Sequence, residues 1–248
     1  MKILQKLHDR DRQLSLYPPA TLGFLGDSVT NGIFEVHPCK DENGKFTIRD
    51  VCEPEENYVA HLRRLLHLLY PRAQLNVINA GISGDNAPNA VKRLGRDLLP
   101  YKPDLTIVCF GLNDMYFGME KLTDYKDGLS AIVDSLQAIG SDVILMTPPM
   151  AATYKHPLVQ GAEFGEVAQQ YARIWQDGTV HAYMQVVRDV AAEKGVKLCD
   201  CFAKWERMYH AGVDTTKLLS NYINHPVRDL HPLIAHSLLD VIFEDARR

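Results

Sequence analysis

Four short groups of residues in this chain carry the functional groups that acyl transfer requires. Three follow apolar runs and the fourth precedes the last amphipathic segment: residues 26–30 (GDSVT), 79–85 (NAGISGD), 111–114 (GLND) and 224–231 (NHPVRDLH). They offer a hydroxyl, glycine N–H groups, a side-chain amide and an imidazole. A serine hydroxyl needs a neighbouring base at neutral pH, and a tetrahedral oxyanion needs preorganised donors. Each group alone is ordinary turn chemistry, but their order along the chain favours one acyl-transfer site.

The elements that would position these groups alternate along the chain. Five short apolar runs predict buried strands, at residues 21–25, 74–79, 104–110, 142–146 and 196–199. Segments with an apolar stripe at helical spacing predict helices at residues 58–69, 87–98, 124–139, 167–194 and 233–243. This alternation predicts parallel strands joined by right-handed crossovers. We therefore expect an α/β protein with an open, doubly wound parallel sheet of about five strands.

Two segments interrupt the alternation. Residues 33–51 are polar, and an Asn43-Gly44 turn signal separates two possible short strands, so we expect an inserted hairpin or lobe there. Residues 150–165 show no clear periodicity. Both segments follow the carboxyl ends of predicted strands, where open α/β sheets bind ligands, and both are candidate pocket walls. A length of 248 residues predicts a single domain over residues 1–248, with the insertion at 33–51.

Composition and charge argue against several classes of partner. Lys and Arg (27) nearly balance Asp and Glu (31), and the net charge of −4 gives no electrostatic reason to expect nucleic acid or an anionic membrane surface. No run approaches the roughly 18 apolar residues of a membrane span. The first residues lack the apolar core of a secretory signal. The number of cysteines is odd (5), and reduced thiols are the simplest explanation for it. We expect a cytoplasmic protein, and an oligomer is compatible with all of these features.

The four groups, in this order, resemble the motifs of the SGNH (GDSL-type) hydrolases, and the resemblance runs from about residue 21 to the C-terminus. It implies that Ser28 is the nucleophile and that its own N–H is one oxyanion donor. It further implies that Gly84 supplies the second donor and that the side chain of Asn113 supplies the third. The fold implied is a three-layer α/β/α sandwich with a flavodoxin-like sheet, in agreement with the strand pattern.

The last group departs from the family pattern, in which an Asp stands three residues before the catalytic His-Pro pair. Two His-Pro pairs are present here. Three residues before His225 stands Tyr222, and three before His231 stands Arg228; the carboxylate nearest to His231 is Asp229, one residue too close. The distance to the final helix and the spacing of the two histidines favour His225 as the base. His231, with Asp229, remains the alternative.

A histidine base without the usual carboxylate still needs its tautomer to be fixed. A backbone carbonyl, Asn221, Asn224 or a carboxylate distant in sequence could accept the hydrogen bond that does so. Asp229 could also reach His225 from the next turn. The remaining possibility is a Ser-His dyad with no third member.

The sequence therefore predicts a serine esterase that hydrolyses a carboxylic ester through an acyl-enzyme intermediate. A short acyl group on an acetylated carbohydrate or another small soluble ester is favoured by the polar insertion. The alternatives are a lysophospholipase or acyl thioesterase, and a catalytically silent binding module on the same fold. No cofactor and no metal are expected, because His37, Cys39 and Cys52 lack the paired spacing of a zinc site.

Overall fold

The structure, a computed structural model, describes residues 1–159 and 161–244. Its central sheet is parallel, with the strand order β4-β1-β5-β6-β7. These strands are β1 (Ala20–Gly26), β4 (Leu75–Gly81), β5 (Leu105–Cys109), β6 (Asp142–Met146) and β7 (Lys197–Cys199). Counted along the chain within this sheet, the order is 2-1-3-4-5, which is the flavodoxin-like order. The predicted five-stranded, doubly wound sheet is confirmed.

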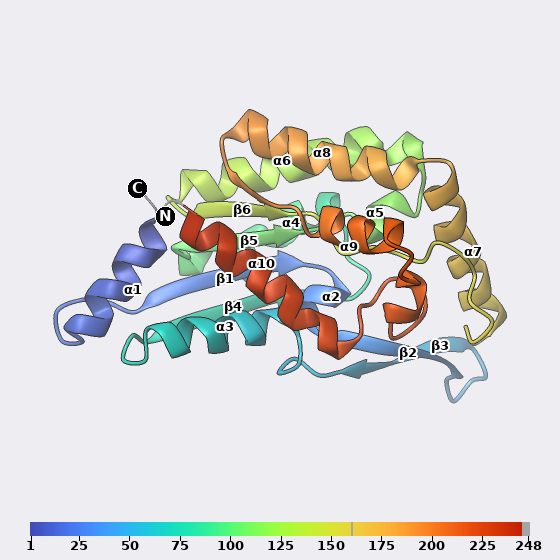
Figure 1. Ribbon diagram of the computed structural model, residues 1–248, viewed down its shortest axis with the longest axis horizontal. Helices are drawn as coiled ribbons and strands as arrows, with labels where there is room; N and C mark the ends of the chain where they lie inside the picture. The colour runs from blue at the N-terminus through green and yellow to red at the C-terminus, as the bar shows by residue number, and fades with distance from the viewer. Residues whose placement is uncertain (160, 245–248) are drawn as a thin grey trace.

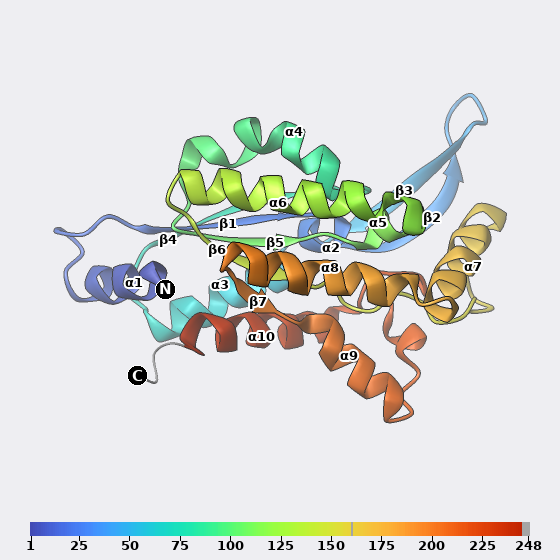
Figure 2. The same cartoon turned by 90° about the horizontal axis from the view of Figure 1, so that it is seen from above.

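Helices cover both faces of the sheet and make three layers (Figures 1 and 2). On one face α4, α6 and α8 lie side by side, and on the other α3 and α10 pack against each other, with α1 against β1. The long helices are α1 (Lys2–Arg12), α3 (Tyr58–Leu69), α4 (Ala87–Asp97), α6 (Leu122–Ala138), α7 (Ala162–Gln176), α8 (Thr179–Lys194), α9 (Cys201–His210) and α10 (His231–Phe243). Short helices are α2 (Ser28–Asn31) and α5 (Leu112–Met115), with 3₁₀ turns η1 (Leu99–Tyr101), η2 (Met119–Lys121), η3 (Thr215–Leu218) and η4 (Arg228–Leu230).

The inner strands are apolar almost throughout because helices cover both of their faces. Every residue of β5 is buried, and in β1 only Thr21 is partly exposed. The buried side chains of the two helical layers and the sheet form one continuous cluster. This continuous burial explains why apolar runs in the sequence located the inner strands to within two residues; the edge strands β4 and β7 are only partly buried.

One predicted helix is wrong in its extent. The sequence pattern predicts a single helix over residues 167–194, but α7 ends at Gln176 and α8 begins at Thr179. The break falls at Gly178, which has a φ of +83°, a conformation that ends a helix and that glycine adopts without steric cost. The turn redirects the chain, so that α8 packs beside α6 while α7 lies at the carboxyl end of the sheet (Figure 1).

The insertion predicted at residues 33–51 corresponds to two antiparallel strands, β2 (Ile33–Lys40) and β3 (Phe46–Cys52), which form a separate two-stranded sheet. The hairpin projects from the carboxyl end of the main sheet, near α7 (Figure 2). Cross-strand pairing puts Val36 with Asp50 and Pro38 with Ile48, so these side chains share one face. The hairpin also contacts α7, where the Phe46 and Phe164 ring centroids lie 6.2 Å apart.

Candidate active site

The carboxyl ends of three neighbouring strands meet at one level of the sheet. Gly26, the last residue of β1, is in register with Gly81 of β4 on one side and with Cys109 of β5 on the other. The first three sequence groups lie at or just after these positions. The register of the sheet therefore brings the serine turn, the glycine loop and the turn that carries Asn113 to the same edge, as open α/β sheets do for their ligand sites.

The serine turn is a tight connection from β1 into α2. A side chain at Gly26 would overlap the Thr30 hydroxyl and lie 2.8 Å from the Cys109 carbonyl oxygen, so only glycine fits. Asp27 caps α2, because its Oδ1 accepts the Val29 N–H at 3.0 Å. Ser28 is the first residue of α2, where a backbone N–H has no partner within the helix. The turn thus presents the Ser28 hydroxyl and its unpaired N–H together.

The Ser28 hydroxyl lies against the imidazole of His225. The Oγ–Nε2 distance is 2.8 Å, and both residues are 4% exposed. The other ring nitrogen, Nδ1, lies 2.8 Å from the carbonyl oxygen of Phe34 in β2. A carbonyl only accepts, so Nδ1 carries the proton and Nε2 is left with the lone pair that faces the Ser28 hydroxyl. The backbone of Phe34 thus occupies the position of the missing carboxylate.

Burial lowers the pKa of His225 to about 4, against the opposing effects of the Phe34 hydrogen bond and of the nearby Glu35 charge. The imidazole is therefore neutral throughout the physiological range. A neutral imidazole with its lone pair on the serine is the form that accepts a proton during nucleophilic attack.

This pKa gives a prediction for the acid limb of the pH profile. If His225 is the base, its protonation makes kcat/KM fall in acid with a midpoint near pH 4. Hydrolysis of p-nitrophenyl acetate across the acid limb, with circular dichroism to show that the fold persists, measures it. A midpoint near the ordinary histidine value of about 6.5 would contradict it.

Asn221 organises the loop that carries His225. Its Oδ1 accepts the backbone N–H groups of Ile223, Asn224 and His225 at 2.9, 3.0 and 3.1 Å. Asn224 donates to the Tyr171 hydroxyl at 3.1 Å. Neither asparagine is hydrogen-bonded to the imidazole of His225. Of the acceptors that the sequence left open, the structure places a backbone carbonyl, that of Phe34, against the ring.

His231 and Asp229 lie apart from this arrangement. The His231 ring is fully buried at the start of α10, where its Nδ1 accepts the Tyr58 N–H at 3.0 Å. Burial lowers the pKa of His231 to about 3. Asp229 is exposed, and the Nδ1 of His225, one of the atoms it could have reached, is hydrogen-bonded to the Phe34 carbonyl oxygen. The structure therefore brings neither residue to Ser28.

Asp229→Asn is accordingly expected to leave kcat for p-nitrophenyl acetate within about twofold of wild type, as is usual for an exposed position without a structural role. The matched comparison is Asp240→Asn, at another charged position near the C-terminus. A fall in kcat of about tenfold or more with Asp229→Asn alone would return Asp229 to the site as the orienting group.

Gly84 and Asn113 line the same pocket as Ser28 and His225. Gly84 has a φ of +75°, which glycine adopts without steric cost. The Asn113 side chain donates one Nδ2 hydrogen to the Asp85 carbonyl oxygen at 2.8 Å, which fixes the amide beside the glycine loop. Since an amide NH₂ has two hydrogens, the second remains for a ligand.

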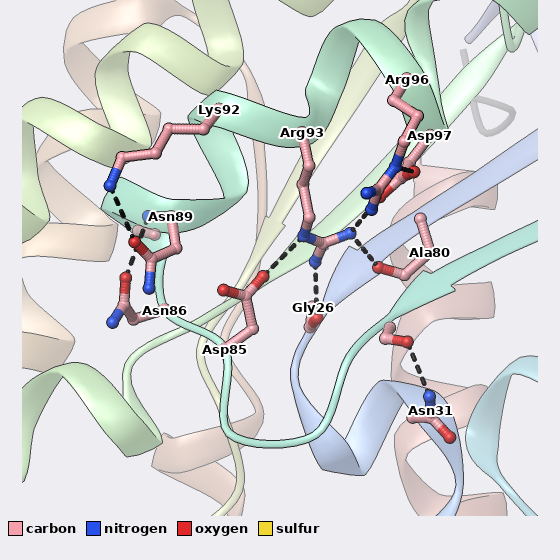
Figure 3. A network of polar contacts seen from close by, with 12 residues as sticks. Gly26, Asn31, Ala80, Asp85, Asn86, Asn89, Lys92, Arg93, Arg96 and Asp97 are labelled. Atoms are coloured by element: carbon pink, nitrogen blue, oxygen red, sulfur yellow. Dashed lines mark hydrogen bonds and ion pairs between the residues drawn. The ribbon is translucent and has the colours of Figure 1, made fainter.

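A buried arginine ties the serine turn to the glycine loop (Figure 3). Arg93 of α4 donates to the Asp85 carboxylate at 2.7 Å, to the Ala80 carbonyl at 2.7 Å and to the Gly26 carbonyl at 3.2 Å, and it also pairs with Asp97. The motifs in the sequence do not mark Arg93 as a site residue. Its only signal is that it follows Ala90 by three residues and so shares the buried face of α4.

Arg93→Met is expected to destabilise the fold by about 3–5 kcal/mol, because it leaves the buried Asp85 carboxylate without its partner. It should also lower kcat, since the loop of Gly84 and the turn of Ser28 lose their shared anchor. Chemical denaturation and p-nitrophenyl acetate kinetics measure the two effects. Arg96→Met, one turn away and exposed, is the control and should leave both unchanged; equal stability of the two variants would contradict the expected role.

Two carboxyl groups beside the site are buried without a cationic partner. Burial raises the pKa of Asp27 and of Asp114 to about 7, and each has one oxygen with no hydrogen-bond partner among the described residues. The other oxygen accepts a backbone N–H, from Val29 and Ala87 respectively. Both groups hold the loops that carry Ser28 and Asn113.

The pocket has a volume of about 410 Å³. Much of its wall is apolar and comes from the hairpin, from the turn after α5, from α7 and from the His225 loop: Val36, Ile48, Phe117, Phe164, Val167 and Ile223. The wall contains Asp50 but no Lys or Arg among residues 1–159 and 161–244. A hollow of about 880 Å³ between α3 and β4 contains none of the predicted site residues.

No three His, Cys, Asp or Glu side chains in the described part of the chain are grouped so that they could hold a metal ion. The Cys39 thiol donates a hydrogen bond to the Thr47 carbonyl oxygen, and the Cys52 thiol donates one to the Asn31 side-chain oxygen, so the two thiols have different partners. Within the same ranges, no helix combines the length and the apolar character that crossing a membrane requires.

Comparison with known proteins adds independent findings. The sequence model of the GDSL-like Lipase/Acylhydrolase family matches residues 24–233. An acetylxylan esterase of Geobacillus stearothermophilus is 31% identical over 134 residues, 50% of this chain and 58% of that protein. The uncharacterized lipoprotein YqeF of Bacillus subtilis is 27% identical over 150 residues, 56% of this chain and 59% of that protein. The chain thus spans less than two thirds of the length of these curated relatives.

Solved structures with the same fold cover nearly the whole chain. The acetylxylan esterase Axe2 of Geobacillus stearothermophilus superposes with a TM-score of 0.64 at 23% identity, covering 90% of this chain and 94% of that one. A lipase/acylhydrolase of Enterococcus faecalis gives a TM-score of 0.66 at 19% identity, covering 91% and 96%. At these identities the likeness establishes the three-layer α/β/α fold.

Proposed function

Because the chain belongs to the GDSL-like Lipase/Acylhydrolase family, we propose that it is a serine esterase in which Ser28 attacks a carboxylic ester and His225 takes the serine proton. The observation that carries this proposal is the Ser28 Oγ–His225 Nε2 distance of 2.8 Å, with the imidazole held in the accepting tautomer by Phe34. A nucleophile, a base within hydrogen-bond reach and a group that orients the base are the three parts that activation of a serine requires.

In the first half-reaction the Ser28 oxygen bonds to the ester carbon as its proton moves to Nε2 of His225. The N–H groups of Ser28 and Gly84 and the free amide hydrogen of Asn113 stabilise the oxyanion, each such donor contributing roughly 3–4 kcal/mol in comparable sites. Collapse transfers the proton to the leaving alcohol and leaves the acyl group on Ser28. Water then repeats the sequence, with His225 as the base, and releases the acid.

The pocket wall favours a neutral ester. Its one carboxylate, that of Asp50, makes no hydrogen bond or ion pair with the described residues. Among the described residues that line the pocket there is no Lys or Arg to bind a phosphate. A coenzyme A thioester or an acidic lysophospholipid would bring negative charge to this wall uncompensated, which is unfavourable. The acetylxylan esterases among its relatives support an acetyl group on a neutral sugar as the substrate.

A substrate series tests this proposal. Acetylated xylooligosaccharide and p-nitrophenyl acetate should be turned over, whereas acetyl-coenzyme A should have a kcat/KM about 100-fold or more lower, because its phosphates meet the Asp50 wall without a counter-charge. The Asp50→Asn variant should narrow this difference. If acetyl-coenzyme A were hydrolysed efficiently and the neutral esters were not, the proposed substrate class would be wrong. If none of these compounds were hydrolysed, the proposed esterase activity would be wrong.

A further inference from the structure

Arg228 lies three residues after His225 and forms ion pairs at the base of the hairpin. Its Nη1 and Nη2 donate to the two oxygens of Glu35 at 2.7 and 2.9 Å, and its Nε donates to Glu53 at 2.6 Å. The guanidinium also lies 4.3 Å from the centroid of the Phe34 ring. One side chain from the histidine loop therefore holds β2, through Glu35, and the residue directly after β3, Glu53.

The held segment includes the carbonyl that orients the base. Phe34 precedes Glu35, and its carbonyl oxygen accepts the Nδ1 proton of His225. The pairing of β2 with β3 shifts register between Ile33 and Val36, so Phe34 and Glu35 lie in an irregularity without cross-strand partners of their own. The sheet ladder alone therefore leaves the direction of this carbonyl under-determined.

We propose that Arg228 is a positioning residue, which fixes the Phe34 carbonyl through Glu35 and Glu53 and thereby the tautomer and direction of His225. The proposal rests on the proposed function, in which His225 is the base. The three side chains, which we call the Arg228 clamp, thus support the Phe34 carbonyl, which takes the place of the aspartate in the family pattern.

The chemistry of the clamp suits this role. A two-pronged guanidinium–carboxylate contact fixes direction as well as distance, which a single ammonium contact does not. The hydrogen bonds from Arg228 lower the pKa of both Glu35 and Glu53, so the two carboxylates stay ionised well below neutral pH. The side chains are 29–41% exposed, and ion pairs this accessible contribute little to folding stability. If Arg228 positions His225, its replacement should therefore lower kcat without a comparable loss of folding stability. If Arg228 only stabilises the fold, the loss of activity should follow the loss of stability.

The test combines kinetics with a spectroscopic readout of the imidazole. For Arg228→Gln, kcat for p-nitrophenyl acetate should fall about 100-fold while KM changes little, as expected when a reacting group is misplaced but substrate binding is intact. Arg228→Lys, which keeps the charge but lacks the fork, should recover only part of kcat. Arg188→Gln is the matched control: this arginine is comparably exposed and pairs with Asp200 at 2.8 Å, outside the site, and its replacement should leave kcat unchanged.

Nitrogen-15 NMR of His225 gives the readout that does not depend on turnover. Wild type should show Nδ1 protonated and Nε2 unprotonated, and Arg228→Gln should show a mixture of the two tautomers. If Arg228→Gln kept the wild-type tautomer or the wild-type kcat, the proposed positioning role would be wrong. It would also be wrong if kcat fell only in proportion to the loss of folded protein. Failure of the esterase itself is seen separately, as wild type being no faster than Ser28→Ala.

Discussion

Ser28→Ala is expected to lower kcat for p-nitrophenyl acetate by about 10⁴-fold or more, the scale seen when a serine hydrolase loses its nucleophile. The hydroxyl is the only group of Ser28 that is removed, and the N–H that would serve the oxyanion remains. The fold should persist, because the variant loses one hydrogen bond, to His225, worth about 1 kcal/mol. Initial rates for wild type and variant, with denaturation curves for both, measure the two effects.

The control for this variant is Ser135→Ala. Ser135 lies on α6 and its hydroxyl bonds to the Ala131 carbonyl within that helix, so the same chemical change is made away from the pocket. Its kcat should equal that of wild type. If Ser28→Ala retained wild-type turnover while folded, another group would have to be the nucleophile and the proposed mechanism would be wrong.

The second large effect separates the two histidines. His225→Ala should lower kcat by about 10⁴-fold, because Ser28 then has no base within reach. His231→Ala should instead lower the free energy of unfolding by about 1–3 kcal/mol, because the buried Tyr58 N–H loses its acceptor, and kcat of the folded fraction should stay close to wild type. Rates at a temperature well below both unfolding transitions keep the two effects apart.

The opposite pattern would be decisive against this assignment. If folded His231→Ala lost turnover and His225→Ala kept it, the base would be the histidine that the structure buries beneath Phe34 and Tyr58. The site would then have to rearrange for catalysis. No such rearrangement is needed in the proposed mechanism, since Ser28 and His225 are already 2.8 Å apart.

The fold was accessible from the sequence because its signals are local. Each inner strand is buried on both faces and so is a continuous apolar run, and the strand–helix alternation leaves few topologies. Ser28 and Asn113 follow two such runs, Gly84 follows the edge strand β4, and the register of Gly26 with Gly81 and Cys109 brings their turns together. The break at Gly178 was missed because one glycine within a helical pattern does not by itself end a helix.

A backbone carbonyl was among the acceptors that the sequence left open for His225, but the residue that supplies it could not be predicted, for a physical reason. A backbone carbonyl is present at every residue and carries no signature in side-chain types. Phe34 is 191 residues from His225, and its carbonyl is aimed by an irregularity in the hairpin that pairing rules do not locate. The same holds for Arg228 and Glu35, whose contact depends on how the hairpin folds back on the C-terminal loop.

The most direct test of the central claim is to trap the acyl-enzyme. Wild type mixed with excess p-nitrophenyl acetate and quenched in acid before steady state should gain the mass of one acetyl group, and peptide mapping should place it on Ser28. His225→Ala should accumulate little of this adduct, because its Ser28 lacks the base. Covalent catalysis by Ser28 would be contradicted if the acetyl group were found on another residue, or if wild type turned over without forming any adduct. Wild-type turnover by Ser28→Ala would contradict it as well.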